Sequence, residues 1–119
     1  NVTTFKHTGG ILTVLDQVVD FELKRLFYIY AVDDSDRGGH RHHNTHQAAI
    51  CINGSCKISN NDGKKTEIFH LDSPEKCLIL EPEDWHVMHD FSSEAILLVL
   101  ASSPIDPKDY IYEPYDNSL

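Results

Sequence analysis

The stretch that decides the fold, residues 37–63, reads RGGHRHHNTHQAAICINGSCKISNNDG. Two short segments, 47–52 and 57–59, are separated by Asn53-Gly54, a dipeptide typical of tight turns in β-hairpins. A second turn sequence, 60–63, follows the second segment directly. Short segments with turns between them predict antiparallel strands joined by hairpins.

The same pattern continues in both directions along the chain. We expect further strands at 11–15, 21–32, 65–71, 77–80 and 95–101. The tail, 106–117, contains prolines and is expected to hold only one short helix or turn. Short strands at this spacing predict an all-β fold, a small jelly-roll β-barrel that closes around a ligand cavity.

The composition is that of an ordinary folded domain. With 119 residues, 40% hydrophobic and 24% charged, the chain is expected to form a single domain, residues 1–119. Its longest apolar run, Ala95–Ala101, is far shorter than the ~20 residues that span a bilayer. A net charge of −9 argues against nucleic acid or an acidic membrane as a partner, whereas a small anionic ligand needs only a local arginine.

The cysteines indicate a reducing environment. Cys51, Cys56 and Cys77 are an odd number without a CxxC spacing, which favours buried thiols over a disulfide framework. No secretory leader is recognisable, so we expect a cytoplasmic protein. The chain begins at Asn1 rather than methionine, which leaves a longer bifunctional parent protein open.

A cluster of histidines carries the chemistry. The sequence holds eight histidines, four of them within residues 37–47. In an extended strand, residues two apart point to the same side, so His40 and His42 are expected to share one face, with His43 pointing away. The cluster has three interpretations: a solvated polar loop, a metal site, or a pair of groups for acid–base catalysis.

The spacing around the histidines resembles the first motif of the cupins. His40 and His42, then four residues, Gln47, six residues and Gly54 follow that motif. Metal-binding cupins have a glutamate ligand where this chain has Gln47. When the second cupin motif is aligned on Pro82, Val87 stands in place of its metal-binding histidine. A neutral amide is a poor replacement for a carboxylate on a divalent ion, so we expect no metal and two histidines free to move protons.

A narrower resemblance covers nearly the whole chain. The chain is similar to the sugar-nucleotide 3,4-ketoisomerases at residues 24–30, 37–42, 46–47, 53–57, 71–74, 85–86, 90–91, 97–102 and 109–110. These are metal-free cupins that act on dTDP-4-keto-6-deoxyglucose, in the synthesis of amino-deoxy sugars for surface polysaccharides such as lipopolysaccharide. The chain departs from the family at Arg41, where alanine is usual, and at Asp84, where the family is usually apolar.

The resemblance implies an isomerase without a cofactor. Such an enzyme converts a dTDP-linked 4-keto-6-deoxy sugar into its 3-keto isomer through an enediol, and the resemblance gives the two proton-transfer roles to His40 and His42. A tyrosine hydroxyl near the sugar oxygens would stabilise the enediolate. Tyr28, on the preceding strand, is the catalytic candidate for this role, and Tyr30 shares its face as a substrate-binding or interface residue.

Four further residues are candidates for binding the substrate. The fork of Arg37 matches a sugar oxygen or the pyrophosphate. Gln47 is expected to hydrogen-bond to a catalytic imidazole or to the sugar. Trp85 is expected to stack on the thymine, to cap the pocket or to pack in the core. His86 is expected to face the sugar from another strand of the barrel.

The resemblance also implies a homodimer that exchanges N-terminal strands, with Phe5 to Leu15 as the exchanged element. Two rival functions remain open at this stage. One is a metal-dependent cupin enzyme that uses His40, His42 and either His86 or His89. The other is a non-catalytic sugar-binding cupin domain. The sequence leaves open which of His40 and His42 is the carbon base, the configuration at C4 of the product, and the final sugar.

Overall fold

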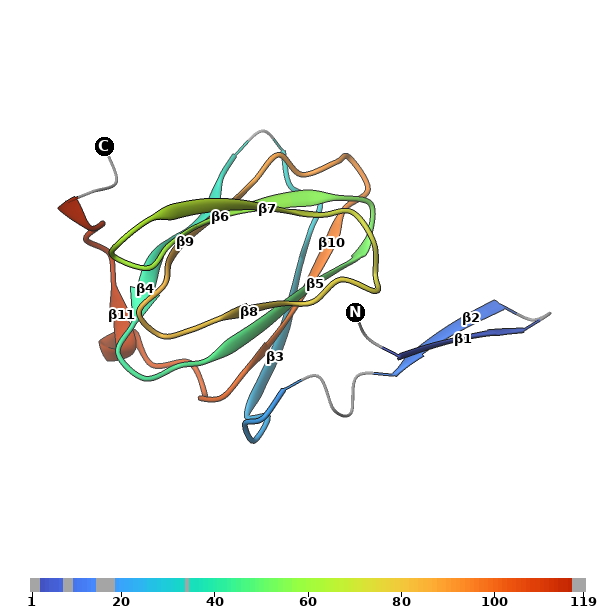
Figure 1. Cartoon of the computed structure of the whole chain (residues 1–119), viewed down its shortest axis with the longest axis horizontal. Coiled ribbons are helices and arrows are strands. Elements are labelled where there is room, and N and C mark those ends of the chain that lie inside the picture. Colours follow the sequence, from blue (N-terminus) through green and yellow to red (C-terminus); the bar gives the residue numbers. More distant parts are fainter. Residues whose placement is uncertain (1–2, 8–9, 15–18, 34, 117–119) are drawn as a thin grey trace.

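Two antiparallel sheets face each other in the computed structural model, which describes residues 3–7, 10–14, 19–33 and 35–116 (Figure 1). One sheet has the strand order β3 (Arg25–Tyr30), β10 (Ile96–Ala101), β5 (Gln47–Asn53), β8 (Leu78–Leu80). The other has the order β11 (Tyr110–Ile111), β4 (Arg37–His42), β9 (Trp85–His89), β6 (Cys56–Asn61), β7 (Thr66–Leu71). The predicted all-β fold, a small jelly-roll barrel, is confirmed.

The hydrophobic core lies between the two sheets. Strand β10, which the long apolar run predicted, is hydrogen-bonded on both sides, to β3 and to β5. Its inward residues Leu97 and Val99 are completely buried and pack with Ile58 and Met88 from the facing sheet. The alternation of side chains along the strands therefore fills one half of the barrel with apolar groups and leaves the other half for polar ones.

The turn at Asn53-Gly54 differs from the prediction. It does not close a hairpin, because β5 pairs with β10 and β8, whereas β6 pairs with β7 and β9. Instead it carries the chain from one sheet to the other. Gly54 has φ +67°, and a Cβ there would lie 3.0 Å from the Cα of Ala95, so the corner requires glycine. The second predicted turn, at 60–63, does join the hairpin of β6 and β7.

The N-terminal strands stand apart from the barrel. Strands β1 (Thr3–His7) and β2 (Gly10–Val14) pair with each other, and neither belongs to one of the two barrel sheets (Figure 1). They take up most of the element predicted to exchange between subunits, Phe5 to Leu15, although residues 8, 9 and 15 lie outside the described part of the chain. A two-stranded hairpin alone is marginally stable in water, so this one needs a further surface to pack on.

The C-terminal tail confirms the expected short helical turn and then rejoins the barrel. A 3₁₀ turn, η1 (Pro107–Asp109), is capped by the side chain of Asp106, which accepts from the amide of Lys108 at 3.0 Å. Strand β11 follows directly and pairs with β4, with Tyr110 opposite His42. The tail thus places its residues beside the histidine strand. No helix among the described residues is long and apolar enough to cross a membrane.

Candidate active site

Three imidazoles meet in the polar half of the barrel. His40 and His42 share one face of β4, as predicted, with ring centroids 5.0 Å apart. His86 lies opposite His40 in the β4–β9 ladder, and their centroids are 4.9 Å apart. The close approach of the strands needs Gly38, since a Cβ there would lie 3.0 Å from the carbonyl oxygen of His86. His42 and His86 are almost completely buried, at 3% and 1% exposure.

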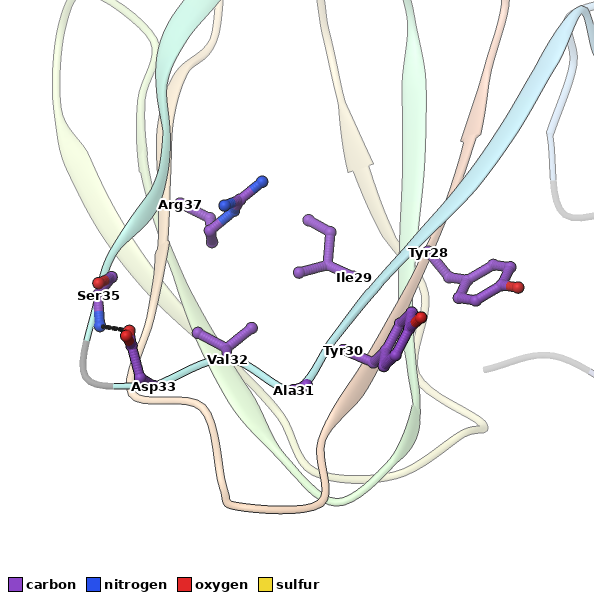
Figure 2. Close-up of a pocket in the computed structure, with 8 residues that line it drawn as sticks. All are labelled: Tyr28, Ile29, Tyr30, Ala31, Val32, Asp33, Ser35 and Arg37. Atoms are coloured by element: carbon purple, nitrogen blue, oxygen red, sulfur yellow. Dashed lines mark hydrogen bonds between the residues drawn. The ribbon is translucent and has the colours of Figure 1, made fainter.

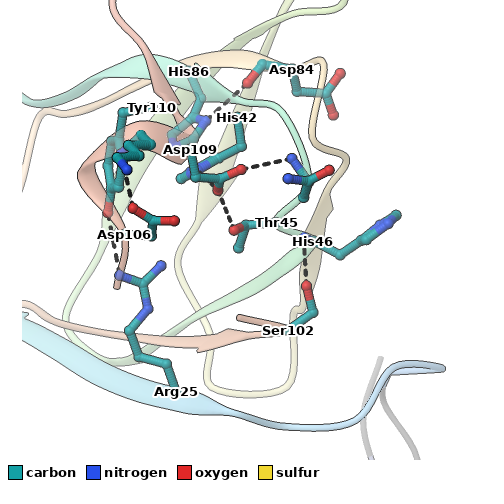
Figure 3. Close-up of polar contacts among 12 residues, drawn as sticks. Arg25, His42, Thr45, His46, Asp84, His86, Ser102, Asp106, Asp109 and Tyr110 are labelled. Atoms are coloured by element: carbon teal, nitrogen blue, oxygen red, sulfur yellow. Dashed lines mark hydrogen bonds and ion pairs between the residues drawn. The ribbon is translucent and has the colours of Figure 1, made fainter. Parts of the chain in front are cut away.

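A carboxylate from the tail orients His42. The Nδ1 of His42 lies 2.9 Å from Oδ2 of Asp109, which also accepts a short hydrogen bond from the hydroxyl of Thr45 (Figure 3). The other oxygen of Asp109 accepts from the amide of Asn44 at 2.8 Å. Because a carboxylate only accepts, the network assigns the imidazole hydrogen to Nδ1. The Nε2 of His42, buried and without a hydrogen-bond partner, is then an unprotonated base.

His86 has the same arrangement with a different partner. Its Nδ1 lies 3.1 Å from the carbonyl oxygen of Asp84, so Nδ1 carries the hydrogen of the neutral ring. Its Nε2 is also buried without a partner. Two inward-facing nitrogens can therefore accept a hydrogen bond or a proton from a bound molecule.

Burial keeps the three imidazoles neutral. Burial, together with the neighbouring His86 and His42, lowers the pKa of His40 to about 3. Burial lowers the pKa of His86 to about 4. The pKa of His42 is also lowered by burial, although Asp109 opposes that shift. At neutral pH all three rings are therefore neutral, as a general base requires.

Asp109 itself stays charged. Burial raises its pKa, but hydrogen bonds from Thr45 and the amide of Asn44 outweigh burial and leave the pKa below its ordinary value. A charged carboxylate at Nδ1 holds the His42 ring in one tautomer and stabilises the imidazolium that forms when Nε2 accepts a proton.

The site contains residues that sequence reasoning did not single out. Tyr110 packs on both imidazoles of β4, with its ring centroid 4.6 Å from that of His40 and 4.8 Å from that of His42. Its hydroxyl accepts from Nη1 of Arg25 at 3.3 Å. Asp109 and Arg25 likewise went unrecognised. The only signal was that all three lie in stretches that carry the family resemblance.

Gln47 lies on the inner face of β5, whereas Trp85 lies on the opposite face of β9 from the inward His86. Gln47 is 2% exposed, and its Oε1 is buried without a partner. Trp85 is half-buried at the start of β9, where its Nε1 donates to the carbonyl of Tyr112 at 3.4 Å. It lines a small pocket of about 180 Å³ with Asn61.

Tyr28 and Tyr30 do not join the histidines. Residues of β3 alternate between faces, and the inward positions are taken by Arg25, Phe27 and Ile29. Tyr28 and Tyr30 therefore point outward, 60% and 63% exposed, with ring centroids 5.8 Å apart. Within one chain, neither hydroxyl is in position to meet a sugar held by the imidazoles.

Arg37 lies at the mouth of a larger pocket. This pocket has a volume of about 380 Å³, and its lining includes Arg37, Ile29, Val32, Tyr28 and Tyr30 (Figure 2). The side chain of Arg37 is exposed at the start of β4. It precedes His40 by three residues, with an irregularity in the ladder at Gly38 and Gly39 between them.

Among the described residues, the three imidazoles are also the group that could hold a metal ion. Their ligand atoms lie within 4.8 Å of one another. The cupin alignment put Val87 at the position of the fourth ligand, but the structure turns His86 inward instead. His89 is not part of the group, because its Nε2 lies 2.7 Å from Oγ of Ser59. Three nitrogens about 2.1 Å from one ion lie about 3 to 3.5 Å apart, so binding would draw the rings together.

Acid is expected to destabilise the fold through the buried imidazoles. The pKa values of His40 and His86 in the folded chain are about 3 and about 4, whereas an unfolded histidine titrates near 6.5. Between about pH 6.5 and 4, the unfolded chain therefore binds more protons, and the free energy of unfolding falls as the pH is lowered.

Urea unfolding between pH 7.5 and 4.5 measures this dependence. His86→Gln should make the free energy of unfolding depend less on pH. His70→Gln, which changes an exposed imidazole, should leave that dependence unchanged. An equal slope in the wild type and in His86→Gln would contradict the prediction.

Comparisons with known proteins identify the family of this chain. The family model described as FdtA, WxcM-like, C-terminal matches residues 1–118. A TDP-4-oxo-6-deoxy-alpha-D-glucose-3,4-oxoisomerase from Aneurinibacillus thermoaerophilus is 42% identical over 100 residues, 83% of this chain and 71% of the relative.

Two solved structures are also similar to this chain. A TDP-fucose-3,4-ketoisomerase from Campylobacter jejuni is 40% identical with a TM-score of 0.87, covering 94% of this chain and 85% of that one. The second is a histidine-to-asparagine variant of a 3,4-ketoisomerase from Thermoanaerobacterium thermosaccharolyticum, in complex with TDP-4-keto-6-deoxyglucose. It is 36% identical to this chain with a TM-score of 0.90, and the match covers 94% of this chain and 83% of that one. This chain therefore belongs to the FdtA family of sugar-nucleotide 3,4-ketoisomerases.

Proposed function

We propose that this protein is an isomerase that moves the ketone of dTDP-4-keto-6-deoxyglucose from C4 to C3. The observation that carries the proposal is the buried His42–Asp109 pair, whose free Nε2 faces the interior beside His40 and His86. The relatives support the choice of substrate, since one is named for this 4-oxo sugar and another was crystallised with it. Its product would feed the synthesis of deoxy sugars for surface polysaccharides.

We assign the role of carbon base to His42, because Asp109 holds its ring with Nε2 unprotonated. The Nε2 of His42 removes the proton from C3, the electrons of that C–H bond form a double bond between C3 and C4, and the charge moves to the C4 oxygen. His40, 5.0 Å away, carries a proton between the two oxygens. The His42 imidazolium, which holds the proton taken from C3, then delivers a proton to C4, and the C3 oxygen becomes the new carbonyl.

No metal enters this scheme, because the proton on C3 is already acidified by the neighbouring ketone. The imidazoles supply what the reaction needs, which is a base held close to the carbon. In a metal-dependent cupin, the same nitrogens would be occupied by the ion and could not take up a proton. The two functions are therefore distinguished by whether proton transfer survives a chelator.

The nucleotide part of the substrate would lie toward the mouth of the barrel. A sugar against the imidazoles would leave its diphosphate toward Arg37, which precedes His40 by three residues on β4. Trp85 lies on the other face of β9 from His86 and offers no face to a thymine held inside this barrel. Gln47, buried with an unpaired Oε1, would accept a hydrogen bond from a sugar hydroxyl.

The functional unit would be a homodimer of single-domain chains. Two observations support it: β1 and β2 pair with neither barrel sheet, and β3 exposes a row of large apolar side chains on its outer face, Leu26, Tyr28 and Tyr30. A second copy can cover both. Cys51, Cys56 and Cys77 are free thiols, as a cytoplasmic enzyme would have.

Isotope exchange tests the function directly. Incubated with dTDP-4-keto-6-deoxyglucose in deuterated water, the protein should yield the 3-keto isomer with deuterium on carbon, followed by NMR. The rate should be unchanged in a chelator, after removal of any bound metal. Loss of activity with the metal, restored by adding it back, would favour the metal-dependent alternative. Substrate binding without any carbon-bound deuterium would favour a non-catalytic binding domain.

Single substitutions test the proton path. His42→Asn and His40→Asn each remove a proton-transfer group and should lower kcat about 10²- to 10⁴-fold. TDP binding should persist, because the nucleotide is held elsewhere. His43→Asn is the control, since His43 is exposed on the opposite face, and it should lose less than about tenfold. Near-native turnover in both His42→Asn and His40→Asn would refute the assignment.

Removing the N-terminal strands tests the dimer. Light scattering should give the full chain a mass of two copies, and a chain lacking residues 1–18 should be monomeric. A full-length monomer at micromolar concentration would rule out the dimer. A truncated chain that still dimerises would move the interface to the outer face of β3.

A further inference from the structure

We propose that Arg25 and Tyr110 act as one unit that stabilises the charged oxygen of the enediolate, with Tyr110 as the catalytic hydrogen-bond donor and Arg25 as its positioning residue. The inference rests on the proposed ketoisomerase function and adds to it the group that meets the negative charge. It transfers the role that the sequence suggested for Tyr28 to a residue on a different strand.

Tyr110 lies between the arginine and the imidazoles. It pairs with His42 in the β11–β4 ladder and therefore projects toward the same side of the sheet. Its ring is in contact with both His40 and His42. Its oxygen accepts a hydrogen bond from Nη1 of Arg25, as Figure 3 shows. A hydroxyl that accepts one hydrogen bond still has its own hydrogen to donate, here to a sugar oxygen held above the imidazoles.

Arg25 brings an uncompensated positive charge into the barrel. It occupies an inward position on β3, and its guanidinium carbon lies 5.3 Å from the centroid of the Phe27 ring. Its Nε is buried without a hydrogen-bond partner. Among the described residues, no carboxylate forms an ion pair with it. The charge is thus free to act on Tyr110 and on a bound substrate.

The imidazoles of His42 and His86 have no hydrogen to donate to the substrate oxygen when proton removal begins. His42 and His86 use their ring hydrogens on Asp109 and on the carbonyl of Asp84, so their inward nitrogens only accept. An enediolate formed above them needs a donor and a positive charge, and Tyr110 with Arg25 provides both.

The test compares tyrosine and arginine variants of the full-length protein. Tyr110→Phe keeps the ring contacts but removes the donated hydrogen. It should lower kcat about 10²- to 10³-fold, as for loss of one oxyanion donor, with KM changed less than about threefold. Arg25→Met keeps the aliphatic stem and should lower kcat by a similar factor. The double variant should lose little more than the larger single effect, since the two residues act as a unit.

Matched controls separate this role from a structural one. Tyr112→Phe removes a hydroxyl from an exposed neighbour whose ring is 6.1 Å from His40, and it should stay within about threefold of the wild type. Thermal unfolding and TDP binding report whether each variant is folded. If Tyr110→Phe does not fold, Arg25→Met decides the question.

Three outcomes would overturn the inference. Kcat within about threefold in both Tyr110→Phe and Arg25→Met would exclude the pair. A large loss in Tyr28→Phe together with an unaffected Tyr110→Phe would return the role to the outer tyrosine. Independent, multiplicative effects would show that the two residues do not act together. A wild-type chain without isomerase activity would instead overturn the proposed function, so the two failures are distinguishable.

Discussion

The hydrogen bond between Asp109 and His42 is the constraint on which the rest of the site depends. It joins the 3₁₀ turn of the tail to the end of β4, and the amide of His43, which donates to the carbonyl of Asp109 at 2.9 Å, reinforces the junction. This junction sets the register of β11, which places Tyr110 opposite His42 and within reach of Arg25. One buried carboxylate therefore fixes a base, its tautomer and its neighbouring hydroxyl.

Burying three imidazoles side by side is tolerated because they are neutral. A neutral ring costs far less to remove from water than an imidazolium, and the lowered pKa values of His40 and His86 reflect that difference. The same burial leaves the Nε2 atoms of His42 and His86 without partners, at a cost to stability. The fold thus gives up some stability, most of all in acid, to keep unprotonated nitrogens ready for a substrate.

Local patterns predicted what local geometry determines. The two-residue period of a strand placed His40 and His42 on one face, and the apolar run 95–101 gave the central strand β10. Residues brought together by the register of the two sheets escaped prediction: Asp109 is 67 positions from His42 and Tyr110 is 85 from Arg25. Tyr28 was predicted to stabilise the enediolate because its strand precedes the histidine strand in the sequence. The alternation of side chains along β3 turns Tyr28 outward, and the sequence does not show which face of β3 is the interior.

The two departures from the family pattern leave the interior chemistry intact. Arg41 points away from the histidines, as the strand period predicted. Its guanidinium carbon lies 4.3 Å from the centroid of the Tyr115 ring, and its Nη1 donates a hydrogen bond to the Tyr115 hydroxyl at 3.2 Å. It thereby ties the tail that carries Asp109 to β4 a second time. Asp84 orients His86 through its backbone carbonyl, which any residue supplies. Its buried side chain accepts from the amide of Glu81 at 2.9 Å and so stabilises the turn before β9.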